Sequence, residues 1–106
     1  MIMNLIKRKK IFTTASLCRN FETNVLKYTK EKKIKFPVYV SAGQEFISST
    51  LSEIIKNDLK IKPLIFAQHR SHSTYISFGG DLKELINELL GLKKWLCFWN
   101  GWISIY

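Results

Sequence analysis

Residues 81–91 read DLKELINELLG and carry the clearest structural signal in the chain. Asp81 can cap a helix, and Glu84, three residues later, completes a variant of the capping box. Gly91 is placed to end the helix. The apolar residues recur at three- and four-residue steps on one face: Leu82, Leu85, Ile86, Leu89 and Leu90. The stretch therefore predicts an amphipathic helix with both ends encoded.

Two more helices are expected upstream, over residues 11–30 and residues 45–56. The first predicted helix has an apolar face of Cys18, Phe21, Val25 and Tyr28, and the second has a stripe of Ile47, Leu51, Ile54 and Ile55. We expect both faces to be buried.

Two stretches, one containing Pro37 and one following Pro63, favour extended backbone. FPVYVSA at 36–42 is closed by Gly43, and LIFA at 64–67 suits a short buried strand. A helix, a strand and a further helix are typical of an α/β layer, although one strand does not make a sheet. We expect a mostly helical part of an α/β fold, with most of the sheet missing.

Size and charge limit the possible functions. The 106 residues form at most one domain, and 46% hydrophobic residues are too many for a disordered chain. The net charge is +9, and ten Lys or Arg residues lie within residues 1–36. Such a basic segment raises nucleic acid or an anionic membrane as partners, or it is simply a solvated helix face. Without an RNA-binding or helix-turn-helix signature, we expect neither partner.

The cysteines and the chain start indicate a cytoplasmic protein. Cys18 and Cys97 lie far apart, so neither a zinc site nor a disulfide framework is indicated. MIMNLIKRKK places apolar residues before charge, unlike a signal peptide. No apolar run approaches the length needed to span a bilayer.

Two segments suggest chemistry. Gly43-Gln44-Glu45 opens a predicted helix, and QHRSH at 68–72 follows the predicted strand. Ligands collect at the carboxyl ends of strands in open α/β sheets, and an Arg side chain suits phosphate oxygens. The alternative is that these are ordinary surface residues. A nucleophile that would complete a catalytic triad is not apparent.

Residues 11–91 resemble the beginning of the α subunit of thiamine-diphosphate-dependent 2-oxo-acid dehydrogenases, the pyruvate and acetoin dehydrogenase group. The matching segments are CRNFE (18–22), KIKFPVYVSAGQEFIS (33–48) and IFAQHRSHSTYISFGGDLKELINELLG (65–91). Each motif is weak by itself, and their order and spacing carry the resemblance.

The resemblance implies a fold and an activity. Residues 1–94 would be the N-terminal, mostly helical portion of a parallel-sheet domain that binds thiamine diphosphate. The parent enzyme decarboxylates a 2-oxo acid oxidatively and transfers the acyl group to a lipoyl group. It works with a β subunit, which supplies the glutamate that activates the cofactor, and with a lipoyl acyltransferase. The magnesium-binding G-D-G…N motif lies downstream in the family, so we expect no metal ligands here.

The resemblance also implies residue roles. His69 and Arg70 would hold the cofactor diphosphate, with His69 at a position where many members have Tyr. Tyr39 stands where the family has a substrate-contacting His, which leaves the substrate open. His72 would line the substrate site or support its wall. The catalytic residues stay unidentified.

Gln44 and Glu45 receive a separate interpretation. We expect them to be structural, capping and ordering the helix beside the site. A direct role in binding the cofactor is the alternative.

The last twelve residues, WLCFWNGWISIY at 95–106, fit an out-of-frame tail. The family continues with a glycine-rich stretch whose glycines would fall at 95, 99, 101 and 102, where this chain has Trp95, Trp99, Gly101 and Trp102. Reading the single Trp codon, TGG, one base later gives GG and hence glycine. The tail would then follow a frameshift near Lys93 and Lys94. The alternative is a real apolar patch or membrane anchor.

The resulting expectation is a fragment of a dehydrogenase α subunit that is inactive by itself. The alternative functions are a small basic nucleic-acid-binding protein and a membrane-interface protein. Nucleic-acid binding would weaken steeply with salt, and membrane binding would appear in a liposome flotation assay.

Overall fold

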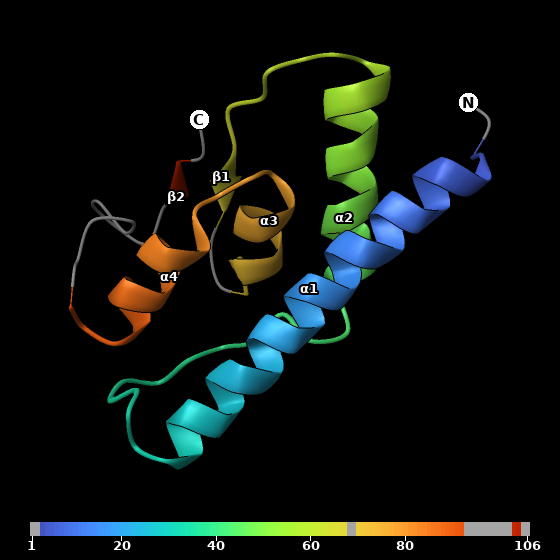
Figure 1. The fold of residues 1–106 in the computed structure, drawn as a ribbon. Helices are drawn as coiled ribbons and strands as arrows, with labels where there is room; N and C mark the ends of the chain where they lie inside the picture. The colour runs from blue at the N-terminus through green and yellow to red at the C-terminus, as the bar shows by residue number, and fades with distance from the viewer. Residues whose placement is uncertain (1–2, 68–69, 93–102, 105–106) are drawn as a thin grey trace.

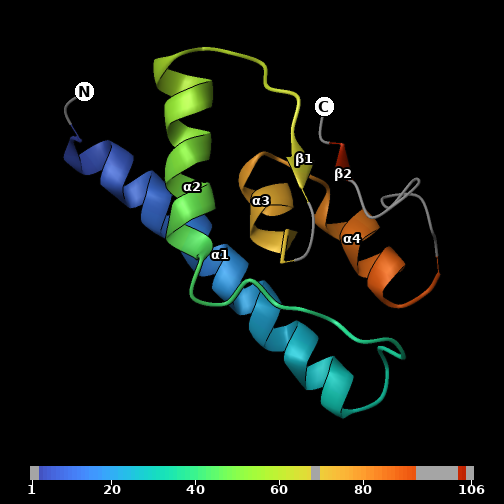
Figure 2. The ribbon, with the colours of Figure 1, turned by 180° about the vertical axis from the view of Figure 1, so that it is seen from behind.

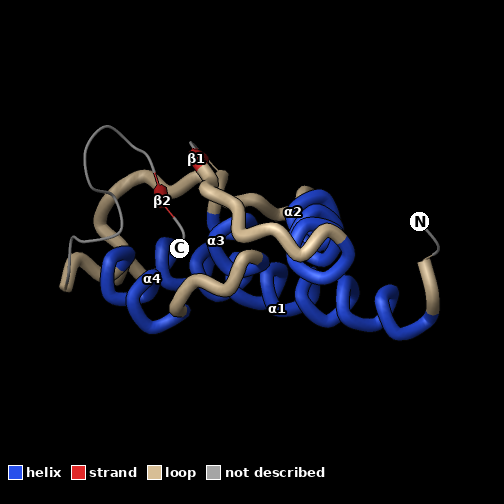
Figure 3. Tube along the Cα trace, turned by 90° about the horizontal axis from the view of Figure 1, so that it is seen from above, coloured by secondary structure: helices blue, strands red, loops and turns tan. Residues whose placement is uncertain are grey.

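The computed structural model describes residues 3–67, 70–92 and 103–104. In chain order the elements are α1 (Leu5–Lys30), α2 (Glu45–Glu53), a π-helical segment η1 (Ile54–Asp58), β1 (Phe66–Ala67), α3 (His72–Ser77), α4 (Leu82–Leu89) and β2 (Ile103–Ser104). The long helix α1 crosses the molecule diagonally in Figure 1, and the view from above shows α2 and α3 on the same side of it (Figure 3). Helices α1, α2 and α3 all contact one another.

Helix α1 begins at Leu5, which is earlier than the predicted start at residue 11. The Asn4 side chain caps it by accepting a hydrogen bond from the Lys7 backbone N–H at 2.9 Å, and Asn is among the best N-cap residues. The buried side chains form one stripe: Ile11, Ala15, Cys18, Glu22 and Val25. Tyr28 was expected on this face but is exposed. The predicted face is therefore mostly correct, and it contains a carboxylate.

The segment from residue 31 to residue 44 runs back along α1 to the start of α2 (Figure 2). The extended run expected at 36–42 forms no strand with any described residue. Instead, Ile34 enters the core, and Val38 and Val40 pack against it. Gly43 has φ +94°, a conformation that favours glycine, and makes the turn into α2.

The buried face of α2 differs from the prediction. Ile47 and Leu51 are 64% and 48% exposed, whereas Glu45, Ser48, Ser49 and Ser52 are buried. Small serine side chains let the helix approach its neighbours closely, and their hydroxyls find acceptors in the helix itself. Ser49 Oγ, for example, donates to the Glu45 carbonyl at 2.6 Å. Periodicity predicted the helix correctly, but its inward face incorrectly.

The prediction of a buried strand at 64–67 was also wrong. Only Phe66 and Ala67 are extended, and they pair antiparallel with Ser104 and Ile103 respectively. Leu64 and Phe66 are exposed, because the described residues provide no layer that covers them. The described part of the chain is mostly helical, and the parallel-sheet fold class stays a prediction.

Helix α4 follows the prediction closely. Asp81 Oδ1 accepts a hydrogen bond from the Glu84 backbone N–H at 3.0 Å, and Gly91 ends the helix region with φ +73°. Its Leu85 and Leu89 enter an apolar cluster, defined here as Cys18, Val25, Ile34, Tyr75, Ile76, Leu85 and Leu89. Ile86 and Leu90, which were expected on the same face, are exposed. Among the described residues, none of the helices combines the length and apolar character that crossing a bilayer requires.

Helix α3 was not predicted. It occupies His72–Ser77, a stretch for which no helix or strand was predicted. Its Tyr75 hydroxyl donates to the Asp81 carbonyl at 3.2 Å, which fixes the turn between α3 and α4. A side chain at Gly80 would begin 2.4 Å from the Tyr75 ring, so this turn requires glycine. The result is a short helix held against the middle of α1.

Candidate functional site

A buried polar cluster lies where α1, the segment before α2 and α3 come together. Glu22 is fully buried (0% exposed), and its Oε1 accepts from the Ser41 backbone N–H at 3.1 Å and from the Ser41 hydroxyl at 2.6 Å. His72 Nδ1 lies 3.1 Å from both Glu22 oxygens. The Ser73 backbone N–H donates to Ser41 Oγ at 3.2 Å, and the two serine hydroxyls are also hydrogen-bonded. We call Glu22, Ser41, His72 and Ser73 the polar junction.

The electrostatics of the polar junction fix the protonation of its carboxyl group. Burial by itself raises the pKa of Glu22, but the hydrogen bonds from His72 and Ser41 outweigh it, so the pKa lies below its ordinary value. Glu22 is thus ionised at neutral pH, and His72 Nδ1 must be the donor. The Nε2 atom of the ring is then the nitrogen left for other partners. Glu22 therefore orients His72.

A second carboxylate joins α1 to the start of α2. The buried Glu45 pairs with Arg19, whose second guanidinium nitrogen lies 3.3 Å from Glu45 Oε2. The Gly43 backbone N–H donates to the same oxygen at 2.9 Å. The hydrogen bond from Arg19 lowers the pKa of Glu45, against a smaller opposing effect of burial. These contacts fit the structural role expected of Glu45. The Gln44 side chain, however, does not cap the helix.

Arg70 and Gln44 line one small cavity. Its volume is about 120 Å³, and its other lining residues are Ser41, Ile47, Ser48, Leu51, Ser73, Thr74 and Phe78. Arg70 has φ +59°, an uncommon conformation for a side chain of its size. No described residue forms an ion pair or hydrogen bond with its exposed guanidinium. A guanidinium without a partner among the described residues and a side-chain amide make this cavity suitable for an anion.

The remaining predicted site residues are not gathered at this cavity. His69 lies outside the described residues. Tyr39 is 59% exposed and is not part of the cavity lining. His72 faces Glu22, although its neighbour Ser73 lines the cavity. The structure thus brings together Arg70 and Gln44, and places His72 in the adjoining polar junction.

Sequence reasoning missed the residues that organise the site: Arg19, Glu22, Ser41 and Ser73. A signal for Glu22 was present, because it lies four residues after Cys18 and three before Val25, on the same helical stripe. A carboxylate on a buried face needs partners. The serines offered no comparable signal, since serine is common at surfaces.

Possible metal ligands among the described residues and comparisons with known proteins give no further information on this site. No group of three or more His, Cys, Asp or Glu side chains within the described ranges could hold a metal ion. The chain matches no protein-family model, no curated protein and no solved structure. The predicted out-of-frame tail at 95–106 lies outside the described residues except for the backbone of Ile103 and Ser104.

Proposed function

We propose that residues 11–91 are the N-terminal portion of an α subunit of a thiamine-diphosphate-dependent 2-oxo-acid dehydrogenase, with Arg70 binding the cofactor diphosphate. One observation carries the proposal. Arg70, free of partners in the described part of the chain, shares a cavity with Gln44 of the G-Q-E motif. These residues lie 26 positions apart and belong to two of the segments on which the family resemblance rests.

The third resembling segment, CRNFE, supports the same proposal. Its Arg19 pairs with Glu45 of the G-Q-E motif, and its Glu22 binds Ser41 and His72. The three resembling segments therefore contact one another through charged and polar side chains. Such contacts require specific partners, whereas apolar contacts do not. These contacts support treating the three segments as parts of one unit.

The lining of the cavity fits a phosphate group better than a whole cofactor. A guanidinium fork can donate two parallel hydrogen bonds to phosphate oxygens, and the Gln44 side-chain amide can donate one more. When bound in an assembled enzyme, the cofactor supplies the nucleophilic carbon for decarboxylation of a 2-oxo acid. This chain's contribution is to hold the diphosphate and to orient the His72 ring through Glu22.

Further assignments form part of the same proposal. His69 would bind the diphosphate beside Arg70, and Tyr39 would contact the substrate. The β subunit and the lipoyl acyltransferase would be the partners in a cytoplasmic complex. Because the activating glutamate would come from the β subunit, the isolated chain should not decarboxylate 2-oxo acids. A turnover assay of the isolated chain with thiamine diphosphate, magnesium and a 2-oxo acid would check this, and measurable turnover would contradict it.

A chimeric α subunit provides the main test. Residues 11–91 would replace the corresponding segment of an active dehydrogenase α subunit, which is then expressed with its β subunit. We expect an assembled enzyme that binds thiamine diphosphate. Arg70→Ala should weaken binding roughly tenfold or more, because a hydrogen bond to a charged group is typically worth about 1.5–3 kcal/mol.

Lys83→Ala is the matched control, since it removes an exposed positive charge from α4. It should leave cofactor affinity unchanged. An assembled chimera without cofactor binding would overturn the proposal. Equal cofactor affinities of the Arg70→Ala and Lys83→Ala chimeras would remove Arg70 from the site.

A further inference from the structure

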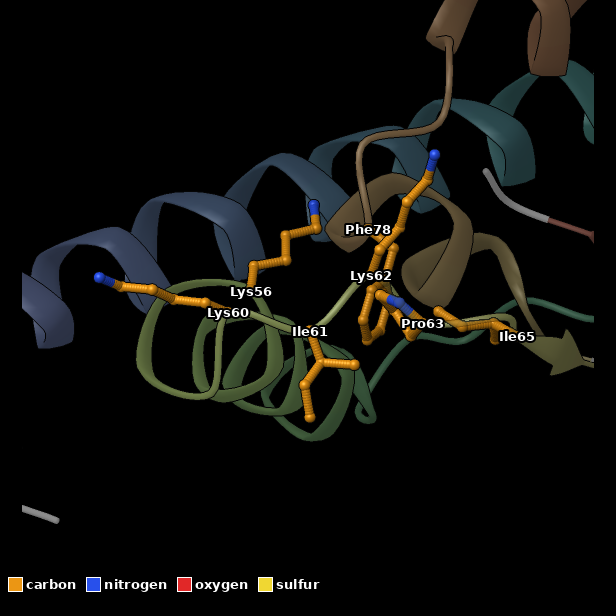
Figure 4. A pocket seen from close by; sticks show the side chains of 7 residues that line it. All are labelled: Lys56, Lys60, Ile61, Lys62, Pro63, Ile65 and Phe78. Carbon is orange, nitrogen blue, oxygen red and sulfur yellow. The ribbon is translucent and has the colours of Figure 1, made fainter.

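A second pocket lies at the end of α2, away from Arg70. Its volume is about 350 Å³, and it is formed where η1 passes into residues 60–65 and meets Phe78 (Figure 4). Ile61, Pro63, Ile65 and Phe78 supply the apolar part of the lining. Phe78 also borders the Arg70 cavity, so this ring separates two differently lined spaces.

Three lysines complete the lining of this pocket: Lys56, Lys60 and Lys62. In Figure 4 the amino groups of Lys56 and Lys62 extend to the same side of the segment, and Lys60 points away from them. None of the three forms a salt bridge with a carboxylate in the described part of the chain. The pocket therefore combines an apolar surface with positive charge that no described carboxylate neutralises.

Lys56 is held in place beside the apolar surface. Its Nζ donates to the Ser77 carbonyl at 3.2 Å and lies 5.6 Å from the centre of the Phe78 ring. An ammonium group has three donors, so this arrangement leaves two for a ligand. Burial lowers the pKa of Lys56, and the charge of Glu53 opposes that effect. An anion in the pocket would replace the lost hydration.

The backbone around the pocket also departs from regular geometry. Lys56 belongs to the π-helical segment η1, and Lys60 has φ +54°. π-helical turns are frequent at functional sites, and residues in sparsely populated conformations cluster there as well. Both departures lie within five residues of each other and present lysines to the same pocket.

We propose that this pocket binds a small amphiphilic anion. Its alkyl or aryl body would lie against Ile61, Pro63 and Phe78, and its phosphate or carboxylate head would lie between Lys56 and Lys62. The volume falls within the usual range for small-molecule sites, about 300–1,000 Å³. Removing the apolar body or the charged head should each weaken binding. This inference does not depend on the proposed cofactor site.

Octyl phosphate, used below the concentration at which it forms micelles, is a suitable probe for the full-length chain. Calorimetric titrations would compare it with inorganic phosphate, which lacks the body, and with octanol, which lacks the charge. Nonanoate would test a carboxylate head. We expect octyl phosphate to bind at least tenfold more tightly than phosphate or octanol. Equal binding of octanol and octyl phosphate would overturn the proposal.

Variants locate the binding. Lys62→Gln and Lys56→Gln should each weaken octyl phosphate binding roughly tenfold, because each removes a hydrogen bond to a charged group. Ile61→Ser should weaken it by removing apolar contact. Lys83→Gln and Ile86→Ser, on the exposed side of α4, are the matched controls. If Lys56→Gln disturbs folding, the affinity of Lys62→Gln for octyl phosphate decides the test. Equal affinities of Lys62→Gln and Lys83→Gln for octyl phosphate would overturn the assignment.

A vesicle assay separates a free anion from a lipid headgroup. Phosphatidylcholine vesicles with and without phosphatidic acid would be sedimented with the chain. A site for a free small molecule predicts that the chain and its Lys62→Gln variant sediment equally with either vesicle. Sedimentation with phosphatidic acid that is lost in Lys62→Gln would instead assign the pocket to a lipid surface, and would overturn the free-ligand proposal.

Discussion

Two buried regions of this small protein are held together by different chemistry. In the apolar cluster, Leu85 and Leu89 of α4 pack with Val25 of α1 and with Tyr75. In the polar junction, Glu22 of α1 binds Ser41 and His72 through charged hydrogen bonds. Both regions contact the same face of α1, one turn apart, since Glu22 and Val25 share its buried stripe.

The two regions have different roles: the apolar cluster mainly stabilises the fold, and the polar junction mainly fixes the positions of individual side chains. Apolar contacts are non-directional and stabilise in proportion to the area removed from water. Hydrogen bonds to a buried carboxylate add less net stability, yet leaving one partner unmatched is expensive. The apolar cluster should therefore tolerate small shifts, whereas the polar junction fixes where Ser41 and His72 lie beside the Arg70 cavity.

The largest loss of stability is expected from Glu22→Ala. It leaves the Ser41 N–H, the Ser41 hydroxyl and His72 Nδ1 without their buried acceptor, and breaking such a pair typically destabilises by about 3–5 kcal/mol. Urea denaturation measures the free energy of unfolding. Glu31→Ala is the control, because Glu31 pairs with Lys33 at the surface, where water screens the ion pair, and its loss should lower the free energy of unfolding far less. Similar losses in both variants would contradict the importance of the polar junction.

Leu85→Ala tests the apolar cluster. Truncating a buried leucine typically destabilises by about 2–5 kcal/mol, through lost transfer free energy and the cavity that remains. The same denaturation experiment applies, with the exposed Leu5→Ala as control. Unlike Glu22→Ala, Leu85→Ala should leave the pH dependence of stability intact. A loss confined to acid conditions would argue against the apolar assignment.

A pair of substitutions in α2 tests its unexpected orientation. Ser49→Val adds volume at a site that is 1% exposed, and overpacking of this kind typically destabilises by about 1–3 kcal/mol. Ile47→Ser, at the exposed position, should change the free energy of unfolding by less than about 0.5 kcal/mol. Thermal denaturation of both variants gives the comparison. The reverse order would mean that the isoleucine stripe is the buried one.

A smaller effect is expected from acid, because protonation removes the charge of Glu22 and retains its volume. The pKa of Glu22 is lowered by folding, so its contribution is fully present above the unfolded pKa of about 4.3 and is lost as pH falls through the lower folded pKa. Glu45, whose pKa Arg19 lowers, acts in the same direction. Stability measured between pH 7 and pH 2 should fall mainly below about pH 4. The fall should be shallower in Glu22→Gln.

The smallest effect concerns the cap of α4. Asp81→Ala removes the side-chain acceptor for the Glu84 N–H, which typically lowers stability by about 1 kcal/mol. Circular dichroism during urea denaturation would measure it, with Lys83→Ala as the control on the same helix. A larger loss would indicate that Asp81 has a role beyond capping.

The sequence predicted locally determined structure better than contacts between distant residues. Residues 81–91 encode a helix and its cap in one local pattern, and both are confirmed. Of the predicted apolar face, Leu85 and Leu89 are buried, whereas Ile86 and Leu90 are exposed. Helix α1 was also predicted, although its start was placed too late because the Asn4 cap was not recognised. In both cases the deciding interactions lie within a few residues of each other.

The site could be predicted only in part, because its contacts join distant positions. Arg70 was singled out as an anion ligand, and its cavity is suited to one. The Glu22–His72 contact joins residues 50 positions apart, and a single sequence gives no direct sign of such a pairing. The buried face of α2 was misjudged because isoleucine normally indicates a core. Here Arg19 and α3 offer polar partners, so a serine face is buried instead.

The π-helical segment η1 has a consequence for the length of the chain. The Leu59 N–H donates to the Ile54 carbonyl five residues earlier at 2.9 Å, one residue more than in an α-helix. This is the geometry left when one residue is inserted into an existing helix. Deleting one residue from 54–58 would restore α-helical spacing and turn everything downstream by about 100° around the axis. Asp58 would then leave Lys7, its ion-pair partner on α1. The segment that carries Lys60 and Lys62 leaves the helix in a direction set by the number of residues in this turn. The identity of any one of these residues matters less.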